Sequence, residues 1–359
     1  MLTIGVVFGG CSVEHEISIL SAIQVMAALK VKDINVIPIY ITKNNKFITG
    51  KKFDVIETFQ TNVRGKRVWF ENATLKGRFL KKKLDCVVSC VHGKGMEGGE
   101  LAGLFEVKKI PYTSIGIMGA SLAQDKILLK DVASKHNIDV IPYVGFSYYE
   151  WSNERQKVKE EINKLKYPLI VKASSLGSSI GIEYVYEEDK LDYAISKVFK
   201  YDERILVEEK LEDFTEYNCA LLGLNETSEI EEVRTSNKIL TFKDKYEGSK
   251  EAIRIIPAEI STDLYEKIIS ITKKVGLLIH NKGVIRIDYL FNKLSETIYL
   301  NEVNTIPGSL AYYLFEPKGI YFEELLTRMI NDAIKAHHHQ KQLIQVFSSN
   351  VLKMKGIKK

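Results

Sequence analysis

The sequence predicts an α/β protein of more than one domain, because strands and helices alternate at its start and strands predominate later. The chain has 359 residues, 45% of them hydrophobic and 27% charged, a length typical of two or three globular domains. Disordered, collagen-like and small disulfide-stabilised proteins have different compositions. We expect an N-terminal domain with a parallel sheet, a small central α+β domain and a C-terminal domain with an antiparallel sheet.

The first 120 residues have the strand, helix, strand order of a parallel sheet. A Gly-Gly turn separates the first strand from the first helix, and a lysine-rich stretch later in the domain lacks the pattern of a buried element. For residues 1–120 we predict strands at 2–8 and 35–41, a helix at 14–30, peripheral hairpins or loops at 43–85, a strand at 85–92, a helix in GELAGLFEVK and a strand in KIPYTS.

The rest of the chain is divided in the same way. A central domain over residues 121–212 has a helix from Ser121 to about Asn137, strands at 169–174, 181–186 and 204–209, and a helix at 187–200. A C-terminal domain over residues 213–336 has strands in FTEYNCALLG, EIEEVRT, GVIRIDYLF and TIYLNEVN, a helix at 261–279 and a closing helix in YFEELLTRMINDAIKAH. We expect residues 337–359 to form a polar, basic tail with three solvent-exposed histidines.

Charge and hydropathy exclude several classes of partner. The formal net charge of +5 is spread along the chain, so it does not favour nucleic acid. No stretch approaches the ~18 apolar residues of a membrane helix, and the start lacks the charged region of a secretory signal. The four cysteines form no C-x-x-C pair, so neither disulfides nor structural zinc is expected. We expect a cytoplasmic protein without nucleic-acid or membrane partners.

Two glycine-rich segments could bind phosphate. Gly93, Gly95 and Gly98 match G-x-G-x-x-G, but the acidic residue that a dinucleotide site needs about twenty residues later is missing. This turn more plausibly presents His92 and backbone N–H groups to a small anion. Lys172 ends a buried strand and precedes the loop SSLGSSI, which either forms a plain hairpin or folds over a triphosphate.

A second group of polar residues lies on two strands near the C-terminus. Arg286 and Asp288 point the same way along one strand, as Glu302 and Asn304 do along the other. Such a face is costly to bury unless it binds something, although a solvated sheet face is the alternative. Carboxylate and amide oxygens suit Mg²⁺ shared with phosphates, and arginine neutralises phosphoryl oxygens.

These motifs together resemble the ATP-grasp superfamily and, within it, the D-alanine D-alanine ligases. The resemblance covers residues 1 to about 336 and implies a three-domain ATP-grasp fold. It also implies a cytoplasmic, homodimeric enzyme that uses ATP and two Mg²⁺ ions, or Mn²⁺, to join two D-amino acids through an acyl phosphate for peptidoglycan synthesis. The motifs, in the family's order, are FGGCSVEHEIS, VHGKGMEGG, QDK, LIVKASSLGSSIG, ILVEE, FTEYNCA, KDKYEG, RIDY and EVNTIPG.

The resemblance implies roles for individual residues. Lys126, Lys172 and Lys245 resemble the lysines that hold ATP phosphates, and Glu208 and Glu216 resemble the residues that bind adenine and ribose. Asp288, Glu302 and Asn304 match the metal ligands, and Arg286 matches the cation at the γ-phosphoryl. Glu14, with Ser178, Tyr246 and His92, matches the residues around the first amino acid, and Gly308 with Ser309 lies where the carboxylate of the second is bound.

The chain departs from the family after its EVNTIPG motif. Where the family commonly has a serine and a leucine that contact the second amino acid, this chain has Ala311, Tyr312 and Tyr313. Tyr246 is the residue associated with an amine acceptor. The second amino acid can therefore be D-alanine or another small one such as D-serine. A non-catalytic nucleotide-binding module is a further alternative, which the intact set of phosphoryl-transfer residues disfavours.

Overall fold

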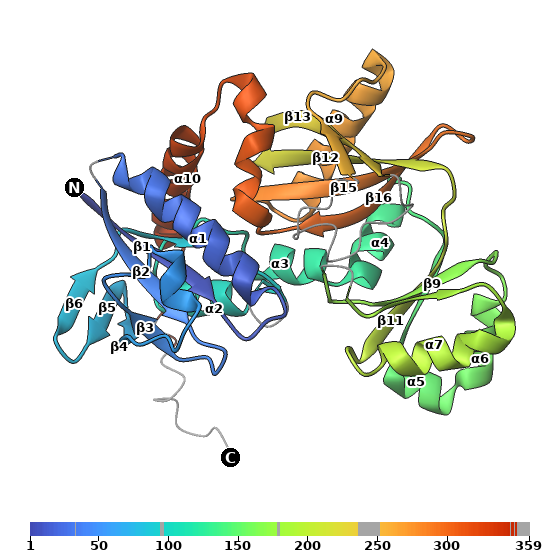
Figure 1. Ribbon diagram of the computed structural model, residues 1–359, viewed down its shortest axis with the longest axis horizontal. Helices are drawn as coiled ribbons and strands as arrows, with labels where there is room; N and C mark the ends of the chain where they lie inside the picture. The colour runs from blue at the N-terminus through green and yellow to red at the C-terminus, as the bar shows by residue number, and fades with distance from the viewer. Residues whose placement is uncertain are drawn as a thin grey trace.

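The computed structural model describes residues 1–32, 34–93, 97–177, 180–235, 252–344, 346, 347 and 349. Its described strands form three sheets of seven, four and five strands (Figure 1). The N-terminal sheet lies at one end of the molecule, the central four-stranded sheet at the other, and the C-terminal sheet between them. None of the helices in these ranges is long and apolar enough to span a membrane.

The N-terminal sheet is mixed rather than purely parallel. Its strand order is β6-β5-β4-β3-β2-β1-β7, and only β1, β2 and β7 pair in parallel. The predicted hairpins at 43–85 extend this sheet with antiparallel strands. The elements are β1 (Leu2–Gly9), α1 (His15–Lys30), β2 (Ile34–Ile41), β3 (Phe47–Thr49), η1 (Ile56–Phe59), β4 (Lys66–Glu71), β5 (Thr74–Gly77), β6 (Leu80–Lys83), β7 (Cys86–Ser89) and α2 (Glu100–Val107).

Two sequence predictions near residue 120 are wrong. The segment KIPYTS forms a single bridge, Val87 to Tyr112, because Pro111 has no N–H to donate to a longer ladder. The helix predicted from Ser121 to Asn137 is two helices, α3 (Ile117–Gln124) and α4 (Lys126–Lys135). Asp125 separates them: its backbone is extended and its carboxylate accepts from the N–H groups of the first turn of α4.

The central domain is an antiparallel sheet covered on one side by helices (Figure 1). Strand β8 and helices α5 and α6 were not among the predicted elements. Their buried aromatic and aliphatic side chains, including Phe146, Trp151 and Ile162, complete the core beneath β9 and β11. The elements are β8 (Tyr143–Ser147), α5 (Tyr148–Asn153), α6 (Arg155–Ile162), β9 (Leu169–Ala173), β10 (Ile182–Val185), η2 (Glu188–Lys190), α7 (Leu191–Val198) and β11 (Arg204–Glu209).

The C-terminal sheet has the order β14-β13-β12-β15-β16 and is antiparallel, as predicted. Apolar side chains of α3, α4 and α9 share one core with one face of this sheet, so the opposite face is left for polar residues. Helix α10 packs instead against β7 and α1 of the N-terminal domain and continues through the three histidines. The elements are β12 (Phe214–Leu222), β13 (Glu226–Thr235), β14 (Ala252–Ile255), α9 (Thr262–Leu278), β15 (Val284–Asn292), β16 (Thr297–Asn304), η3 (Gly308–Leu314), η4 (Glu316–Lys318) and α10 (Phe322–Gln342).

We predict that Gly283→Ala destabilises the contact between the N-terminal and C-terminal domains. A Cβ at Gly283 would lie 2.1 Å from the carbonyl oxygen of Thr113, so backbone must move, at a cost of ~1–3 kcal/mol. The matched control is Gly103→Ala within α2, where the nearest atom is a side-chain methyl of Ile117 at 3.7 Å. In urea denaturation, Gly283→Ala should have a lower midpoint than the wild type, and Gly103→Ala should not. Equal midpoints for the two variants would contradict this packing.

Candidate active site

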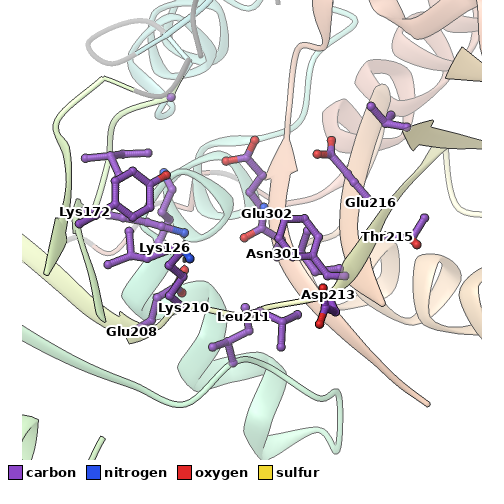
Figure 2. Close-up of a pocket in the computed structure, with 18 of the residues that line it drawn as sticks. Lys126, Lys172, Glu208, Lys210, Leu211, Asp213, Thr215, Glu216, Asn301 and Glu302 are labelled. Atoms are coloured by element: carbon purple, nitrogen blue, oxygen red, sulfur yellow. Dashed lines mark hydrogen bonds and ion pairs between the residues drawn. The ribbon is translucent and has the colours of Figure 1, made fainter. Parts of the chain in front are cut away.

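A cavity of about 340 Å³ lies between the central sheet and the C-terminal sheet. Five residues that the sequence singled out line it: Lys126, Lys172, Glu208, Glu216 and Glu302. Figure 2 shows Lys126, Lys172 and Glu208 on one side of the cavity, facing Glu302 and Glu216 on the other. The cavity therefore joins a cationic wall to an acidic wall, which is the arrangement that a phosphate chain with bound metal requires.

The cationic wall is organised by one buried carboxylate. Glu208 and Lys130 are each only 1% exposed, and Oε2 of Glu208 lies 2.9 Å from Nζ of Lys130. The other carboxylate oxygen accepts from Nζ of Lys172. Burial raises the pKa of Glu208, but the ammonium groups of Lys130 and Lys172 outweigh burial and hold this pKa at about 2. Glu208 is thus an anion that fixes Lys172 at the cavity. The sequence analysis missed Lys130, although it lies one helical turn after Lys126.

Lys126 lies where the three domains meet. Its Nζ donates to the carbonyl oxygen of Leu176, 2.5 Å away in the loop after β9. Burial lowers the pKa of Lys126, and nearby carboxylates oppose this effect. In decreasing order of influence these carboxylates are Glu302 of the C-terminal domain, Glu208 of the central domain and Glu14 of the N-terminal domain.

Glu302 and Glu216 of the acidic wall lie on the polar face of the C-terminal sheet, whereas Arg286, Asp288 and Asn304 are not among the described residues that line the cavity. Asp288 of β15 lies opposite Glu302 of β16, and Arg286 opposite Asn304, so the four side chains share one face as predicted. The pairing shifts beside Asp288, where the extra residue Asn301 enters β16. This bulge turns both Asn301 and Glu302 toward the cavity. The sequence pattern assumes strict alternation and therefore could not have found Asn301.

Arg286 and Asp288 form a two-pronged ion pair. Nε and Nη2 of Arg286 each donate to one carboxylate oxygen of Asp288 at 2.7 Å. Nδ2 of Asn304 donates to the same carboxylate at 3.0 Å. Although burial opposes it, Asp288 keeps the pKa of Arg286 well above its usual value. The oxygen donors of Asp288, Asn304 and the adjacent Glu302 are of the type that hard divalent cations prefer, so these residues fit a magnesium site.

The glycine turn after β1 positions Glu14. Gly9 and Gly10 have φ of 91° and 102°, and a Cβ on Gly9 would lie 2.3 Å from the carbonyl oxygen of Ile41. His15 fixes the turn, with Nδ1 2.6 Å from the carbonyl oxygen of Gly10. Glu14 is the residue that precedes the first turn of α1.

The carboxylate of Glu14 lies against two other loops. A Cβ built on Gly93 would lie 2.8 Å from its Oε2, and one built on Gly177 would lie 3.5 Å from both of its carboxylate oxygens. Glu14 therefore lies between the glycine-rich turn of the N-terminal domain and the Ser/Gly loop of the central domain. These are the segments that the sequence analysis grouped around the first amino acid.

His92 and Glu97 belong to the same region. His92 is buried, and its Nδ1 lies 2.7 Å from the carbonyl oxygen of Cys90, so Nδ1 donates this hydrogen bond. Its Nε2 has no hydrogen-bond partner among the described residues. Glu97, which sequence reasoning missed, accepts from the N–H of Gly93 at 2.9 Å and from the hydroxyl of Thr305 at 2.8 Å. Glu97 thereby ties the glycine-rich turn to the segment that follows Asn304.

The segment where the chain departs from the family has an unusual backbone. Ser309, Leu310 and Ala311 all have φ near 50°, a left-handed region that costs L-residues about 1–2 kcal/mol each. The N–H of Ser309 donates to Oγ of Ser21 at 3.0 Å. The two tyrosines that follow diverge: the ring of Tyr312 stacks on Phe322 at 4.4 Å, whereas the hydroxyl of Tyr313 reaches Arg254 and Glu231 on the sheet.

Three predicted site residues lie outside the described part of the chain: Ser178, Lys245 and Tyr246. The structure adds an apolar lining to the cavity that the sequence motifs did not identify. The side chains of this lining suit a flat heteroaromatic ring, since they come from several strands and loops and present hydrocarbon surface. They include Ile141, Ile170, Ile182, Tyr184, Leu211, Phe214 and Leu290.

Comparison with known families agrees with this geometry. Residues 3–115 match the profile of the D-ala D-ala ligase N-terminus, and residues 132–331 match that of the D-ala D-ala ligase C-terminus. The chain belongs to the D-alanine–D-alanine ligase family. The predicted family is therefore confirmed, and with it the use of ATP.

Individual relatives resemble the chain over nearly its whole length. It is 34% identical to the D-alanine–D-alanine ligase of Thermosipho africanus and 35% identical to that of Thermosipho melanesiensis, each match covering 99% of both chains. Among solved structures, the VanG D-Ala:D-Ser ligase of Enterococcus faecalis matches with a TM-score of 0.82 at 29% identity, covering 92% of this chain and 99% of that one. The D-alanine-D-alanine ligase of Coxiella burnetii matches with a TM-score of 0.82 at 26% identity, covering 96% and 97%. These matches confirm the predicted ATP-grasp fold.

We predict that Glu208→Gln lowers the free energy of unfolding by ~3–5 kcal/mol, because Lys130 would remain buried without its counter-charge. The control Glu209→Gln, next on the same strand but partly exposed, should change it little. Since folding depresses the pKa of Glu208 to about 2, its contribution is full above the usual glutamate pKa of about 4.5 and is lost as the pH falls toward 2. Acid titration of wild type and Glu208→Gln should therefore converge at low pH; a constant difference would contradict this.

Proposed function

We propose that this protein joins two D-alanine molecules at the expense of ATP, through a D-alanyl phosphate. The observation that carries this proposal is the cavity itself, where Lys126 and Lys172 face Glu302. Glu302 lies opposite Asp288 in the β15–β16 ladder, and Asp288 is paired with Arg286. A carboxylate is a poor electrophile, and phosphorylation converts its oxygen into a leaving group that an amine can displace. A site that places several cations around one phosphate stabilises the negative charge that develops on transfer.

ATP would occupy the cavity with its phosphates between the two walls. Lys126 and Lys172, joined by Lys245, would bind the phosphates, and the apolar lining would hold adenine. Glu208 and Glu216 would meet the adenine and ribose edges, as the family resemblance implies. Because Glu208 also binds two ammonium groups, its main contribution would be to hold Lys172 in place.

Asp288, Glu302 and Asn304 would hold two Mg²⁺ ions, and the same oxygen ligands would accept Mn²⁺. When bound, the ions neutralise phosphate charge. Arg286 lies beside this set, so its guanidinium would stabilise the γ-phosphoryl oxygens. Arg286 is tied to Asp288 by both of its prongs, which fixes the guanidinium plane before the substrate arrives.

The first amino acid would lie where the three domains meet. Glu14 would hold its ammonium group, with His92 beside it, and Ser178 and Tyr246 would complete this part of the site. The second amino acid would border Gly308 and Ser309. We further propose a cytoplasmic homodimer that supplies the dipeptide for peptidoglycan.

A second candidate differs only in the second amino acid. The structural similarity to a D-Ala:D-Ser ligase and the presence of Tyr313 where the family commonly has serine favour testing D-serine as the acceptor.

The direct test is phosphate release from ATP with single D-amino acids and with pairs of them, followed by mass spectrometry of the products. We expect release that depends on D-alanine and yields a dipeptide. Release that is independent of any amino acid, or no release with the whole panel, would contradict the proposed function.

Removing one acidic ligand should stop turnover without unfolding the protein. We predict that Asp288→Asn and Glu302→Gln each lower kcat at least about 100-fold in saturating Mg²⁺, because each loses an anionic metal ligand. The control Asp332→Asn changes a half-exposed carboxylate on α10 and should leave kcat unchanged. Wild-type turnover in either site variant would show that the carboxylate holds no metal.

Changing Glu14 should weaken the amino acid rather than the nucleotide. We predict that Glu14→Gln raises KM for D-alanine about 10-fold or more and leaves KM for ATP unchanged, because the lost charge faces an ammonium group. Glu16→Gln is the matched control, since Glu16 is exposed and lies two residues later, in the first turn of α1. If calorimetry shows weaker ATP binding and unchanged amino-acid binding, Glu14 has been assigned to the wrong ligand.

A further inference from the structure

A polar cluster built on the buried residues Asn218 and Glu231 lies beside the reacting centre, under the segment where this chain departs from its family. It consists of Asn218, Glu231, Arg254 and Tyr313, from β12, β13, β14 and η3. The hydroxyl of Tyr313 lies 3.4 Å from Oε2 of Glu231 and 3.4 Å from Nη1 of Arg254. Burial raises the pKa of Tyr313, so this hydroxyl stays protonated at neutral pH.

Glu231 cannot itself bind a substrate. Its side chain is completely buried, and its carboxylate accepts from Nδ2 of Asn218 at 2.9 Å and from Nη1 of Arg254 at 2.9 Å. A buried anion of this kind orients the cation that it binds. Glu231 therefore fixes the guanidinium of Arg254 at one nitrogen.

Arg254 has donors left over. Its side chain is 43% exposed. The two hydrogen bonds that Arg254 donates to described residues both come from Nη1. No described residue accepts from Nε or Nη2. An arginine held by one nitrogen and open at the others is arranged to receive an anion, and its planar fork matches a carboxylate.

The cluster is adjacent to the residues proposed to act on the phosphoryl group. Asn218 lies directly opposite Asp288 in the β12–β15 ladder and opposite Glu231 in the β12–β13 ladder. The positive charges of Arg286 and Arg254 both act on the pKa of Tyr313, so Tyr313 lies near both arginines. Arg254 on β14 and Arg286 on β15 therefore lie along the same polar face of the sheet, with β13 and β12 between their strands.

An acceptor amino acid needs a cation near the reacting centre to bind its carboxylate. Its amine must reach the acyl phosphate, which Arg286 borders, while its carboxylate must be held a few ångströms further away. In this chain the N–H of Ser309 already donates to Ser21, and an uncharged N–H is a weaker partner for a carboxylate than a guanidinium.

We propose that Arg254 binds the α-carboxylate of the acceptor amino acid, and that Glu231 and Tyr313 are the residues that position it. This inference rests on the proposed ligase function and adds a residue to its acceptor site. It assigns a use to the departure at Tyr313, whose hydroxyl lies beside Arg254.

The test is a competition between two acceptors that differ only in the carboxylate. D-alanine and D-alaninamide are supplied together with ATP and Mg²⁺, and the two products, D-alanyl-D-alanine and D-alanyl-D-alaninamide, are quantified by mass spectrometry. The amide has no carboxylate to phosphorylate, so it can act only as the acceptor. The product ratio at equal concentrations gives the ratio of the two kcat/KM values.

We expect the wild-type enzyme to favour the acid, and Arg254→Gln to reduce this preference about 10- to 100-fold. Arg254→Lys retains a charge without the planar fork and should fall between them. Tyr313→Phe should reduce the preference by a smaller factor, with little change in KM for ATP. The matched control is Arg328→Gln, since Arg328 is also half-exposed and paired with glutamates, but lies on α10.

The outcomes separate the two proposals. If the wild-type enzyme forms neither product, the ligase function fails and the acceptor assignment with it. If wild type uses the amide as readily as the acid, the assignment alone is wrong, whatever the folding of the variants. An Arg254→Gln enzyme that folds, judged by circular dichroism, and retains the wild-type preference likewise overturns it.

Discussion

The structure depends on one buried anion. Glu208 lies between Lys130 and Lys172, and an unpaired carboxylate or ammonium at that depth would cost several kcal/mol. The pairing links helix α4, which packs on the C-terminal sheet, to strands β9 and β11 of the central sheet. The interaction that joins α4 to the central sheet also holds Lys172 at the cavity between the central sheet and the C-terminal sheet. The same contact therefore supports both stability and the proposed phosphate binding.

The break between α3 and α4 has a comparable double effect. Asp125 caps α4 and also accepts from the hydroxyl of Ser174 at 2.7 Å, at the end of β9. Lys126 follows immediately, and its backbone N–H donates to the carbonyl oxygen of Ser174 at 2.9 Å. A continuous helix would carry this lysine past the loop. The capped break instead places Lys126 where carboxylates of all three domains act on it.

The sequence alone determined the periodic elements and the residues whose chemistry is local. The alternation in GVIRIDYL and YLNEVNTIPG placed Arg286, Asp288, Glu302 and Asn304 on one face, because side chains alternate with a period of two in any strand. The ordered motifs identified the family and its ATP chemistry. The missing acidic residue after the glycine-rich turn excluded a dinucleotide site without reference to any contact.

Tertiary structure decided the pairings that bring distant segments together. The bulge at Asn301, the burial of Lys130 against Glu208, and the cluster of Glu231, Arg254 and Tyr313 join residues that are up to 82 positions apart. No local pattern encodes such contacts, since propensity and periodicity report on a few neighbouring residues only. Tyr312 stacks on Phe322, whereas Tyr313 contacts charged groups. This difference follows from the left-handed backbone before the two tyrosines. That backbone is set by the packing of η3 between α1 and the sheet, so only the folded chain determines which of the two tyrosines reaches the charged groups of the sheet.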